Sequence, residues 1–252
     1  MGKKIAIYGA GTIGACQATL TSGNGYSTVV IGHSEEGLSR CRNTMLQNWN
    51  DLIAQKLATA ANRRAAMDLV TITNDVSALR DCDIVFEAVS EDVNIKQRVY
   101  SIITEVCGRD IIVVSTTSSI DAAILAEKIE NPARFLIAHP FQPVHMLPLV
   151  EVVRHTETSE ETLNQVCTLL KDLNRQVVML NRSVPGFLVN RFAQALFRES
   201  IYLIEQGITT AADIDRAIKY AVGMRYASIG LLEYYDAVGF ESERAIALNV
   251  YP

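Results

Sequence analysis

The sequence has little cysteine, and the cysteines that it has follow no pattern. Five of the 252 residues are cysteines, scattered over the chain without a CxxC motif, at positions 16, 41, 82, 107 and 167. An odd and dispersed set argues against a disulfide framework and against a cysteine metal site. We therefore expect free thiols, no bound metal and a cytoplasmic location.

Long hydrophobic runs and basic clusters are also absent. No apolar stretch approaches the roughly 20 residues that a membrane helix needs. The formal net charge is −5 and no basic run is present, which argues against nucleic acid or an anionic membrane as a partner. The chain begins MGKKIAIYGAG, so a strand is expected almost at once, with no signal peptide ahead of it.

Short stretches rich in Ile and Val alternate with helical patterns over the first two thirds of the chain. Such stretches predict strands that are covered on both faces of a parallel sheet. Their alternation with helices is typical of a Rossmann-type, doubly wound α/β fold. The expected strands cover residues 3–8, 28–31, 69–73, 84–88, 111–115 and 135–139, with further strands at 149–153 and 176–180.

One interval is too long for a single crossover helix. Residues 35–68 contain few glycines and no proline, and their composition predicts helix. We expect a helical excursion after the second strand, such as a hairpin of two helices.

The chain changes character near Ser183. Ser183 and Pro185 are expected to start a helix, and residues 187–204 are apolar on more than one face, which predicts a buried central helix. Thr210-x-x-Asp213 predicts the cap of a further helix that ends near Gly223. We expect an α/β domain over residues 1–183 and a smaller all-α domain over residues 184–252, which completes its core in a homodimer.

A glycine-rich turn follows the first expected strand. Glycines at these spacings permit a tight turn, close approach of the backbone to a pyrophosphate, and helix–strand packing, while the helix N-terminus offers N–H groups to phosphates. The motif predicts a dinucleotide-binding site at Gly9, Gly11, Thr12, Ile13 and Gly14.

The end of the second strand lacks the acid that binds the adenosine ribose of NAD in such folds. Gly32, His33 and Ser34 follow the strand instead, and Glu35 and Glu36 lie beyond its end. The strand end itself has no acid to repel a 2′-phosphate, and His33, Ser34 and the nearby Arg40 are suited to bind one. The cofactor is therefore expected to be NAD or NADP, with NADP slightly favoured.

Hydride removal from a secondary alcohol needs a base for the hydroxyl proton. His139 ends an apolar strand at the carboxyl edge of the sheet, where ligands of such folds bind. Glu151 lies in the apolar stretch PLVEVV, and a buried carboxylate needs a partner. Pairing of Glu151 with His139 would orient the ring and stabilise its protonated form, so we expect a catalytic pair.

Two further polar residues are candidates for holding the substrate oxygen. Ser118 and Ser119 follow the strand that ends at Ser115, and one of them is alternatively expected to cap the helix near Asp121. Asn190 lies after Pro185-Gly186, where its amide would polarise a carbonyl; otherwise it is an ordinary buried amide.

The strings STTSSI, AHPFQP, PLVEVV and PGFLVNR occur in the order found in the L-3-hydroxyacyl-CoA dehydrogenases, and the chain resembles this family over essentially its whole length. The resemblance implies a dinucleotide-binding domain with a helical excursion, joined to a helical dimerisation domain. Members continue with more helix past the position of Pro252, so we expect the helical domain to be short.

The resemblance also assigns roles to individual residues. His139 matches the catalytic histidine, and Glu151 matches its acidic partner. Ser118 matches the serine that touches the substrate, and Asn190 matches the asparagine near the reacting carbonyl. In SEDVNIK, Glu91 and Lys96 match residues that contact the cofactor.

Departures from the family pattern concern the substrate. Members that use coenzyme A read roughly PVPVMKLVE, whereas this chain reads PVHMLPLVE, with Pro148 in place of the lysine. Family contacts to coenzyme A fall near Asn48 and Gln55. The segment GMRYASIGLLE resembles the L-gulonate 3-dehydrogenase and lambda-crystallin branch, in which Arg225 would meet a substrate carboxylate; alternatively, Arg225 forms a structural ion pair.

We expect an oxidoreductase that transfers a hydride between NAD(P) and the 3-hydroxyl of an L-3-hydroxyacyl substrate. The family as a whole favours a short-chain 3-hydroxyacyl-CoA of the 3-hydroxybutyryl-CoA type. The alternative is a free 3-hydroxy acid such as L-gulonate. A dinucleotide-binding protein without catalytic activity is a third hypothesis, against which the four polar positions argue.

Overall fold

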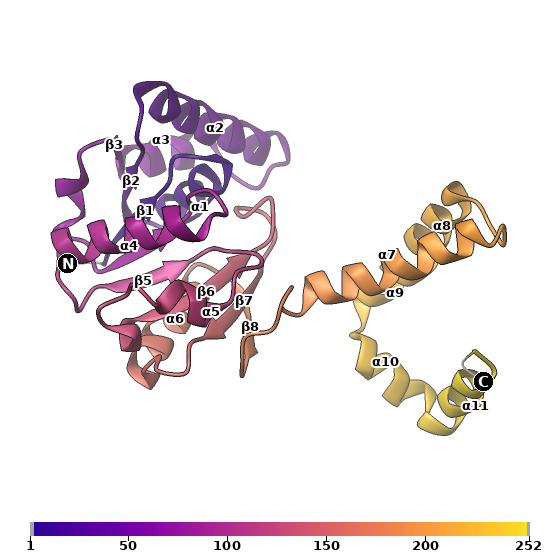
Figure 1. Ribbon diagram of the computed structural model, residues 1–252. Coiled ribbons are helices and arrows are strands. Elements are labelled where there is room, and N and C mark those ends of the chain that lie inside the picture. Colours follow the sequence, from indigo (N-terminus) through magenta and orange to yellow (C-terminus); the bar gives the residue numbers. More distant parts are fainter. Residues whose placement is uncertain (1–2, 251–252) are drawn as a thin grey trace. The chain divides into compact units, whose positions relative to one another are not determined.

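The protein is described here by a computed structural model, which covers residues 3–250. Its first part is built on one eight-stranded sheet in the order β3-β2-β1-β4-β5-β6-β7-β8 (Figure 1). The strands are β1 (Lys4–Tyr8), β2 (Ser27–Ile31), β3 (Val70–Thr73), β4 (Ile84–Glu87), β5 (Ile112–Ser115), β6 (Phe135–Pro140), β7 (Leu149–Arg154) and β8 (Gln176–Leu180). The first six are parallel, β7 is antiparallel to β6, and β8 is parallel to β7.

This strand order confirms the doubly wound fold. The chain leaves β1 toward β2 and β3 on one side and continues from β4 to β6 on the other, so the crevice at the carboxyl ends of β1 and β4 is the topological switch point. Each expected strand is present, with ends shifted by no more than one residue.

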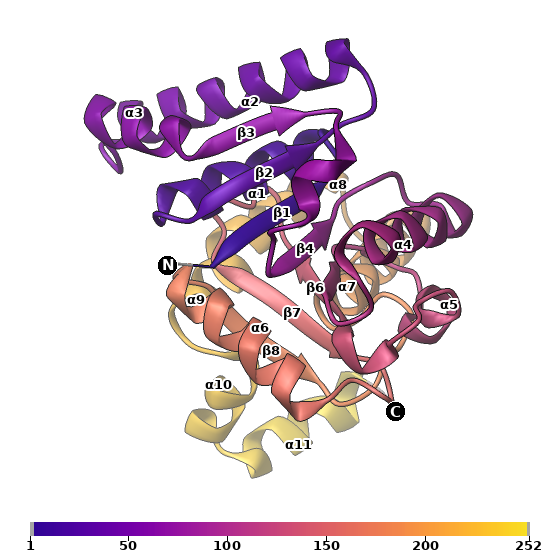
Figure 2. The ribbon, with the colours of Figure 1, turned by 90° about the vertical axis from the view of Figure 1, so that its left-hand side faces the viewer.

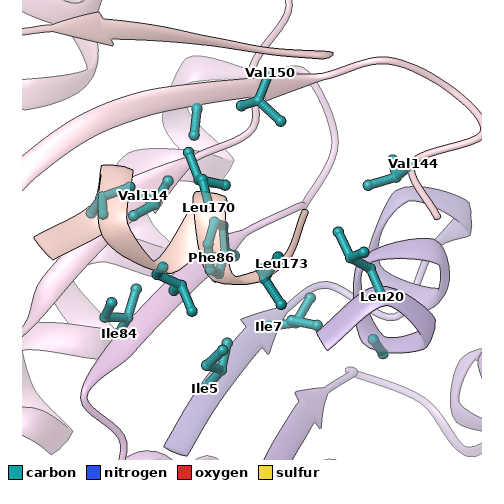
Figure 3. Close-up of a cluster of buried hydrophobic side chains, with 14 of the residues drawn as sticks. Ile5, Ile7, Leu20, Ile84, Phe86, Val114, Val144, Val150, Leu170 and Leu173 are labelled. Atoms are coloured by element: carbon teal, nitrogen blue, oxygen red, sulfur yellow. The ribbon is translucent and has the colours of Figure 1, made fainter. Parts of the chain in front are cut away.

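Helices cover both faces of the sheet. On one face lie α1 (Thr12–Gly23), α2 (Glu35–Ala54) and α6 (Glu160–Asp172), whose apolar side chains share a core cluster with Ile7, Phe86 and Val114 of the strands (Figure 3). On the other face lie α4 (Val93–Cys107) and α5 (Ala122–Ala126). Short 3-10 turns at Val76–Leu79 and Pro132–Arg134 lead into β4 and β6.

The helical excursion is a pair of helices, as expected. After α2, the helix α3 (Ala60–Asp68) leads back into β3, and both lie at the β3 edge of the sheet (Figure 2). Ser34 caps α2, and Thr59 forms a capping box with Asn62 at the start of α3. These local signals explain why the sequence predicts the excursion well.

A second compact unit, residues 190–252, follows the first, and its described part is helical. Its helices are α7 (Val189–Glu205), which begins at the end of the first unit, α8 (Ala211–Ala217), α9 (Gly223–Ser228), α10 (Leu231–Val238) and α11 (Phe240–Val250). Gly207, with a φ of +66°, ends α7, and Thr210 caps α8, both as expected. The expected end at Gly223 is wrong, because a π-helical turn over Ile218–Val222 carries the chain directly into α9.

Two expectations about α7 are also wrong. The helix begins at Val189, well after Ser183 and Pro185, so Ser183 is not its cap. It is not a buried central helix: none of its side chains, all within the described part of the chain, is buried. Phe192, Leu196 and Phe197 keep 52%, 51% and 61% of their surface exposed. The apolar pattern is real, but a single chain does not cover it.

Candidate active site

The glycine-rich turn between β1 and α1 has the shape that a dinucleotide phosphate requires. A Cβ at Gly9 would lie 2.3 Å from the Ala88 carbonyl oxygen, and one at Gly14 would lie 1.8 Å from the Gly9 oxygen. Packing within the protein therefore leaves no room for a side chain at these two positions. A Cβ at Gly11 would meet nothing within 4 Å, so its side opens onto free space.

The helix that follows this turn has no side-chain cap. Gly11 is the N-cap of α1 and makes no capping hydrogen bond from a side chain. In the described first unit, every other α-helix from α2 to α6 has such a cap, from Ser34, Thr59, Asp92, Asp121 and Ser159. Thr12 and Ile13 open the uncapped helix, whose first-turn N–H groups are suited to receive an anion. The turn therefore fits the pyrophosphate of a dinucleotide.

The structure gives a physical reason for the missing acid after β2. A Cβ at Gly32 would lie 2.5 Å from Leu38 Cδ2 and 2.8 Å from Ala10 Cβ. Leu38 itself is buried, so a side chain at position 32 needs this contact to be repacked. His33 is exposed beside this turn, and Ser34 accepts a hydrogen bond from Gly37 N at 3.2 Å.

His139 and Glu151 form a buried pair. They face each other directly in the antiparallel register of β6 and β7, and opposite residues in such a pair point to the same side of the sheet. His139 Nδ1 lies 2.8 Å from Glu151 Oε2. The histidine is 6% exposed and the glutamate is fully buried. A carboxylate accepts hydrogen bonds, so Nδ1 is the donor in this contact, and in the neutral form of the ring Nε2 is then the acceptor.

The second oxygen of Glu151 holds the start of α7. Glu151 Oε1 accepts hydrogen bonds from the backbone N–H groups of Leu188 at 2.9 Å and Val189 at 2.8 Å. This carboxylate thus replaces a local cap such as Ser183. The His139 ring also packs against Phe141 and Phe187, with ring centroids 4.7 and 5.6 Å away. These contacts fix the position of the ring from several sides.

The loop after β5 carries Ser118 and is held by Glu91. Glu91 Oε1 accepts hydrogen bonds from Thr117 Oγ1 at 2.6 Å, Ser118 N at 3.0 Å, and Ser119 Oγ at 3.0 Å. The expectation that Ser118 or Ser119 caps the next helix is wrong, since Asp121 caps α5 through Ala123 N. The loop lies at the carboxyl end of β5, next to β6, which carries His139.

Lys96 is buried, unlike a cofactor contact that faces the solvent. Its side chain is 1% exposed, and Nζ lies 2.7 Å from Glu87 Oε1 and 3.3 Å from Glu91 Oε2. Glu87, at the end of β4, is fully buried. Lys96 therefore joins a buried carboxylate to the carboxylate that holds the Ser118 loop.

Two predicted residues lie in the second unit. Asn190 is the second residue of α7 and follows Val189, whose N–H binds Glu151. Arg225 lies in α9, where its guanidinium stacks on the ring of Tyr234 at 4.3 Å. This contact is a cation–π interaction within the second unit.

Several polar residues near the predicted site are missed by the sequence analysis. They are Glu87, Tyr100, Ser115 and Thr117, which are all buried. A signal was available for two of them, because the strands IVFE and IVVS both end on a polar residue that a buried strand does not tolerate without a partner.

Among residues 3–250, no group of three or more His, Cys, Asp or Glu side chains is arranged to hold a metal ion. Within the same residues, no helix is long and apolar enough to cross a membrane.

A doubly wound sheet, a phosphate-binding turn at its switch point and a buried histidine–carboxylate pair define a nicotinamide-dependent dehydrogenase. The family model for the 3-hydroxyacyl-CoA dehydrogenase NAD binding domain matches residues 4–183, and the model for the C-terminal domain of the same family matches residues 186–251. The chain belongs to the 3-hydroxyacyl-CoA dehydrogenase family. It is an oxidoreductase that uses NAD(P).

Relatives within this family differ in substrate. An L-carnitine dehydrogenase from Bacillus cereus is 32% identical over 229 residues, which cover 90% of this chain and 69% of the relative. A 3-hydroxyadipyl-CoA dehydrogenase from Escherichia coli is 31% identical and aligns over 98% of this chain and 51% of the relative. Among solved structures, (S)-3-hydroxybutyryl-CoA dehydrogenase from Ralstonia eutropha matches with a TM-score of 0.83 and 28% identity, covering 88% of this chain and 78% of the other. The findings support a 3-hydroxy acid dehydrogenase.

Proposed function

We propose that this protein is a dehydrogenase of a free 3-hydroxy acid, with His139 as its catalytic base. The observation that carries the catalytic part is the buried His139–Glu151 contact of 2.8 Å at the carboxyl edge of the sheet. This edge is where substrates of doubly wound folds bind.

His139 takes the hydroxyl proton at Nε2 while Nδ1–H remains bonded to Glu151. As the ring becomes positively charged, the negative charge of Glu151 stabilises it. When bound, the nicotinamide would accept the hydride from the carbinol carbon. In the reverse direction, the imidazolium returns its proton to the substrate oxygen, so His139 is the base in oxidation and the acid in reduction.

Ser118 and Asn190 have supporting roles in this proposal. The Ser118 hydroxyl holds the substrate oxygen from the loop after β5, and the Asn190 amide polarises the carbonyl that forms. Arg225 is a candidate contact for the substrate carboxylate, since a guanidinium binds a carboxylate through two hydrogen bonds.

Four observations favour a free acid over a coenzyme A thioester. Pro148 stands where coenzyme A users carry a lysine, and Gln55 is uncharged. The Asn48 amide, near a family contact to coenzyme A, is buried and donates to Thr19 Oγ1 at 3.1 Å. The similar L-carnitine dehydrogenases act, by their name, on a free 3-hydroxy acid. A short-chain 3-hydroxyacyl-CoA remains the second candidate, supported by the 3-hydroxyadipyl-CoA relative.

For the cofactor we propose NAD in preference to NADP. The first turn of α2 carries Glu35 and Glu36, whose charges repel a 2′-phosphate. Arg40, the nearest candidate to bind that phosphate, already forms an ion pair with Glu36.

The test compares initial rates of oxidation of L-carnitine, L-gulonate and L-3-hydroxybutyryl-CoA, with NAD⁺ and NADP⁺ in parallel. Turnover of a free acid with NAD⁺, at a kcat/KM at least tenfold above that of the thioester, is the expected result. A higher kcat/KM for the thioester would show that the substrate is a coenzyme A thioester. Faster turnover with NADP⁺ would reject the cofactor proposal.

The catalytic role is tested with the variant His139→Gln. It is expected to bind NADH as the wild type does, measured by NADH fluorescence, but to lose turnover by on the order of a thousandfold. If wild type and variant show equal, negligible turnover on all three substrates, the chain is a dinucleotide-binding protein without this activity.

A further inference from the structure

Glu87, at the end of β4, is a buried carboxylate, and both of its oxygens accept hydrogen bonds. Glu87 Oε1 accepts from Lys96 Nζ at 2.7 Å and from Val89 N at 2.9 Å. Glu87 Oε2 accepts from Ser115 Oγ at 2.7 Å and from Tyr100 OH at 2.8 Å. Four donors stabilise the charged form of this carboxylate, which is fully buried.

Lys96 connects this carboxylate to a second one nearer the surface. Its ammonium lies 2.7 Å from Glu87 and 3.3 Å from Glu91, and it also donates to the Val89 carbonyl at 3.4 Å. Two of the three ammonium donors thus make hydrogen bonds, to Glu87 and to the Val89 carbonyl, and Glu91 is an ion-pair partner.

Glu91 connects Lys96 to the loop after β5. One of its oxygens faces Lys96, and the other accepts hydrogen bonds from Thr117, Ser118 and Ser119. The chain of contacts Glu87–Lys96–Glu91 thus runs from the sheet core to the loop that carries Ser118.

We propose that Glu87 and Lys96 are positioning residues, which fix the Glu91 carboxylate so that it holds the loop at residues 117–119 and sets the place of Ser118. This inference rests on the proposed role of Ser118 at the substrate. It differs from direct cofactor binding by Lys96, because the effect reaches the substrate through Glu91.

The charge state of Glu91 provides a readout that packing alone would not move. Partial burial raises the pKa of Glu91, but the hydrogen bond from Thr117 and the Lys96 charge outweigh it and hold that pKa below its usual value. The groups that face Glu91 are Lys96 of α4 and the neutral donors of the loop. Glu87 contacts the same ammonium, and Tyr100, which donates to Glu87, also interacts electrostatically with Glu91. The loop contact is present above this pKa and is lost as the pH falls through it.

The experiment measures the pH profile of kcat/KM for reduction of the 3-oxo acid, at saturating NADH, in Lys96→Met. In this direction His139 is the proton donor, so the acid limb does not report loss of the catalytic base. Without the cation, the pKa of Glu91 rises, so we expect the acid limb of the profile to move up by about one pH unit. At neutral pH, kcat/KM should fall roughly tenfold to a hundredfold because Ser118 is displaced. Lys128→Met, at an exposed lysine, is the matched control and should behave as wild type.

Loss of the buried pair also threatens folding, so a second variant separates the two effects. In Glu87→Gln/Lys96→Met neither buried charge is left unpaired, and its melting temperature is expected to stay close to that of wild type. It should still show the raised acid limb and the lowered kcat/KM. A folded double variant with an unshifted profile, or one in which only the KM for the cofactor rises, would overturn the inference.

Ser118→Ala distinguishes a failure of the inference from a failure of the proposed function. If Ser118→Ala lowers kcat/KM and the Lys96 variants do not, the positioning role is wrong and the proposed role of Ser118 stands. If Ser118→Ala has no effect, Ser118 has no part in the reaction, and both the inference and this part of the proposed function fail.

Discussion

At the scale of single residues, Glu151 shows how a charge is kept in the interior. A carboxylate without partners is very costly to bury, whereas this one accepts hydrogen bonds from two backbone N–H groups and contacts the His139 ring. The same side chain therefore orients the candidate base and fixes the first residues of α7. Removing its charge tests the first role without emptying the position.

We predict that Glu151→Gln lowers kcat by on the order of a hundredfold or more, since the neutral amide no longer stabilises the protonated ring. The measurement is the initial rate at saturating substrate and cofactor, followed by NADH absorbance. The control is Glu160→Gln, at a carboxylate that is 70% exposed and paired with Arg154. A kcat within twofold of wild type would remove Glu151 from the catalytic pair.

At the scale of elements, the turn into α1 separates glycines that the fold needs from one that the ligand needs. A Cβ added at position 14 would lie 1.8 Å from a backbone oxygen, and shifting the backbone to make room for it would cost stability. Gly11 has an ordinary φ of −81° and open space beside it. A methyl group at position 11 therefore meets nothing in the protein itself.

We predict that Gly11→Ala keeps the melting temperature of wild type but weakens NADH binding at least tenfold, because its methyl group occupies the path of the pyrophosphate. Gly14→Ala is expected to lower the melting temperature by several degrees, since overpacking costs about 1–3 kcal/mol. Thermal unfolding and NADH fluorescence titration check both. Unchanged NADH affinity in Gly11→Ala would place the cofactor elsewhere.

The elements also show what the sequence could and could not predict. The strands are predicted to within one residue because strands covered on both faces need continuous Ile and Val, as in β2 and β5. The start of α7 is missed because its N–H groups are bound by Glu151, which is distant in sequence, and no local pattern contains that contact. Ser183 resembles a cap, but tertiary structure supplies a different one.

The candidate site shows the same difference between local sequence patterns and contacts that are distant in sequence. His139 and Glu151 stand out because polar residues in apolar strands need partners, and the register of β6 and β7 brings them together. The binding of Glu91 to the loop after β5 links segments that are separate in sequence, so only the structure reveals it. The sequence therefore points to the candidate catalytic residues more readily than to the residues that hold them in place.

At the scale of the whole molecule, the helices of the second unit do not bury the apolar side chains of α7. Within its described part, large apolar side chains remain exposed on α7, with Phe192, Leu196 and Phe197 each more than half exposed. Phe192 and Leu196 are four residues apart, so they lie on the same side of the helix, and Phe197 widens this apolar surface around the helix. An exposed apolar face of this kind marks an interaction surface.

We propose that a second copy of the chain covers this face, giving a homodimer. Burying one such side chain contributes about 1.5–3 kcal/mol, and a two-fold interface would bury each of the three twice. Size-exclusion chromatography with light scattering should give twice the 27.7 kDa chain mass. Phe197→Asp should shift the protein toward monomer, because a desolvated carboxylate opposes association.

The control for the dimer is Leu57→Asp, which changes another large apolar side chain, with 67% exposure, in the first unit. It should leave the mass unchanged. A wild type that is monomeric at every concentration would show that the apolar side of α7 serves something other than self-association. A Phe197→Asp variant that remains fully dimeric would place the interface on another surface, since a charge in the centre of a desolvated contact cannot be accommodated without loss of affinity.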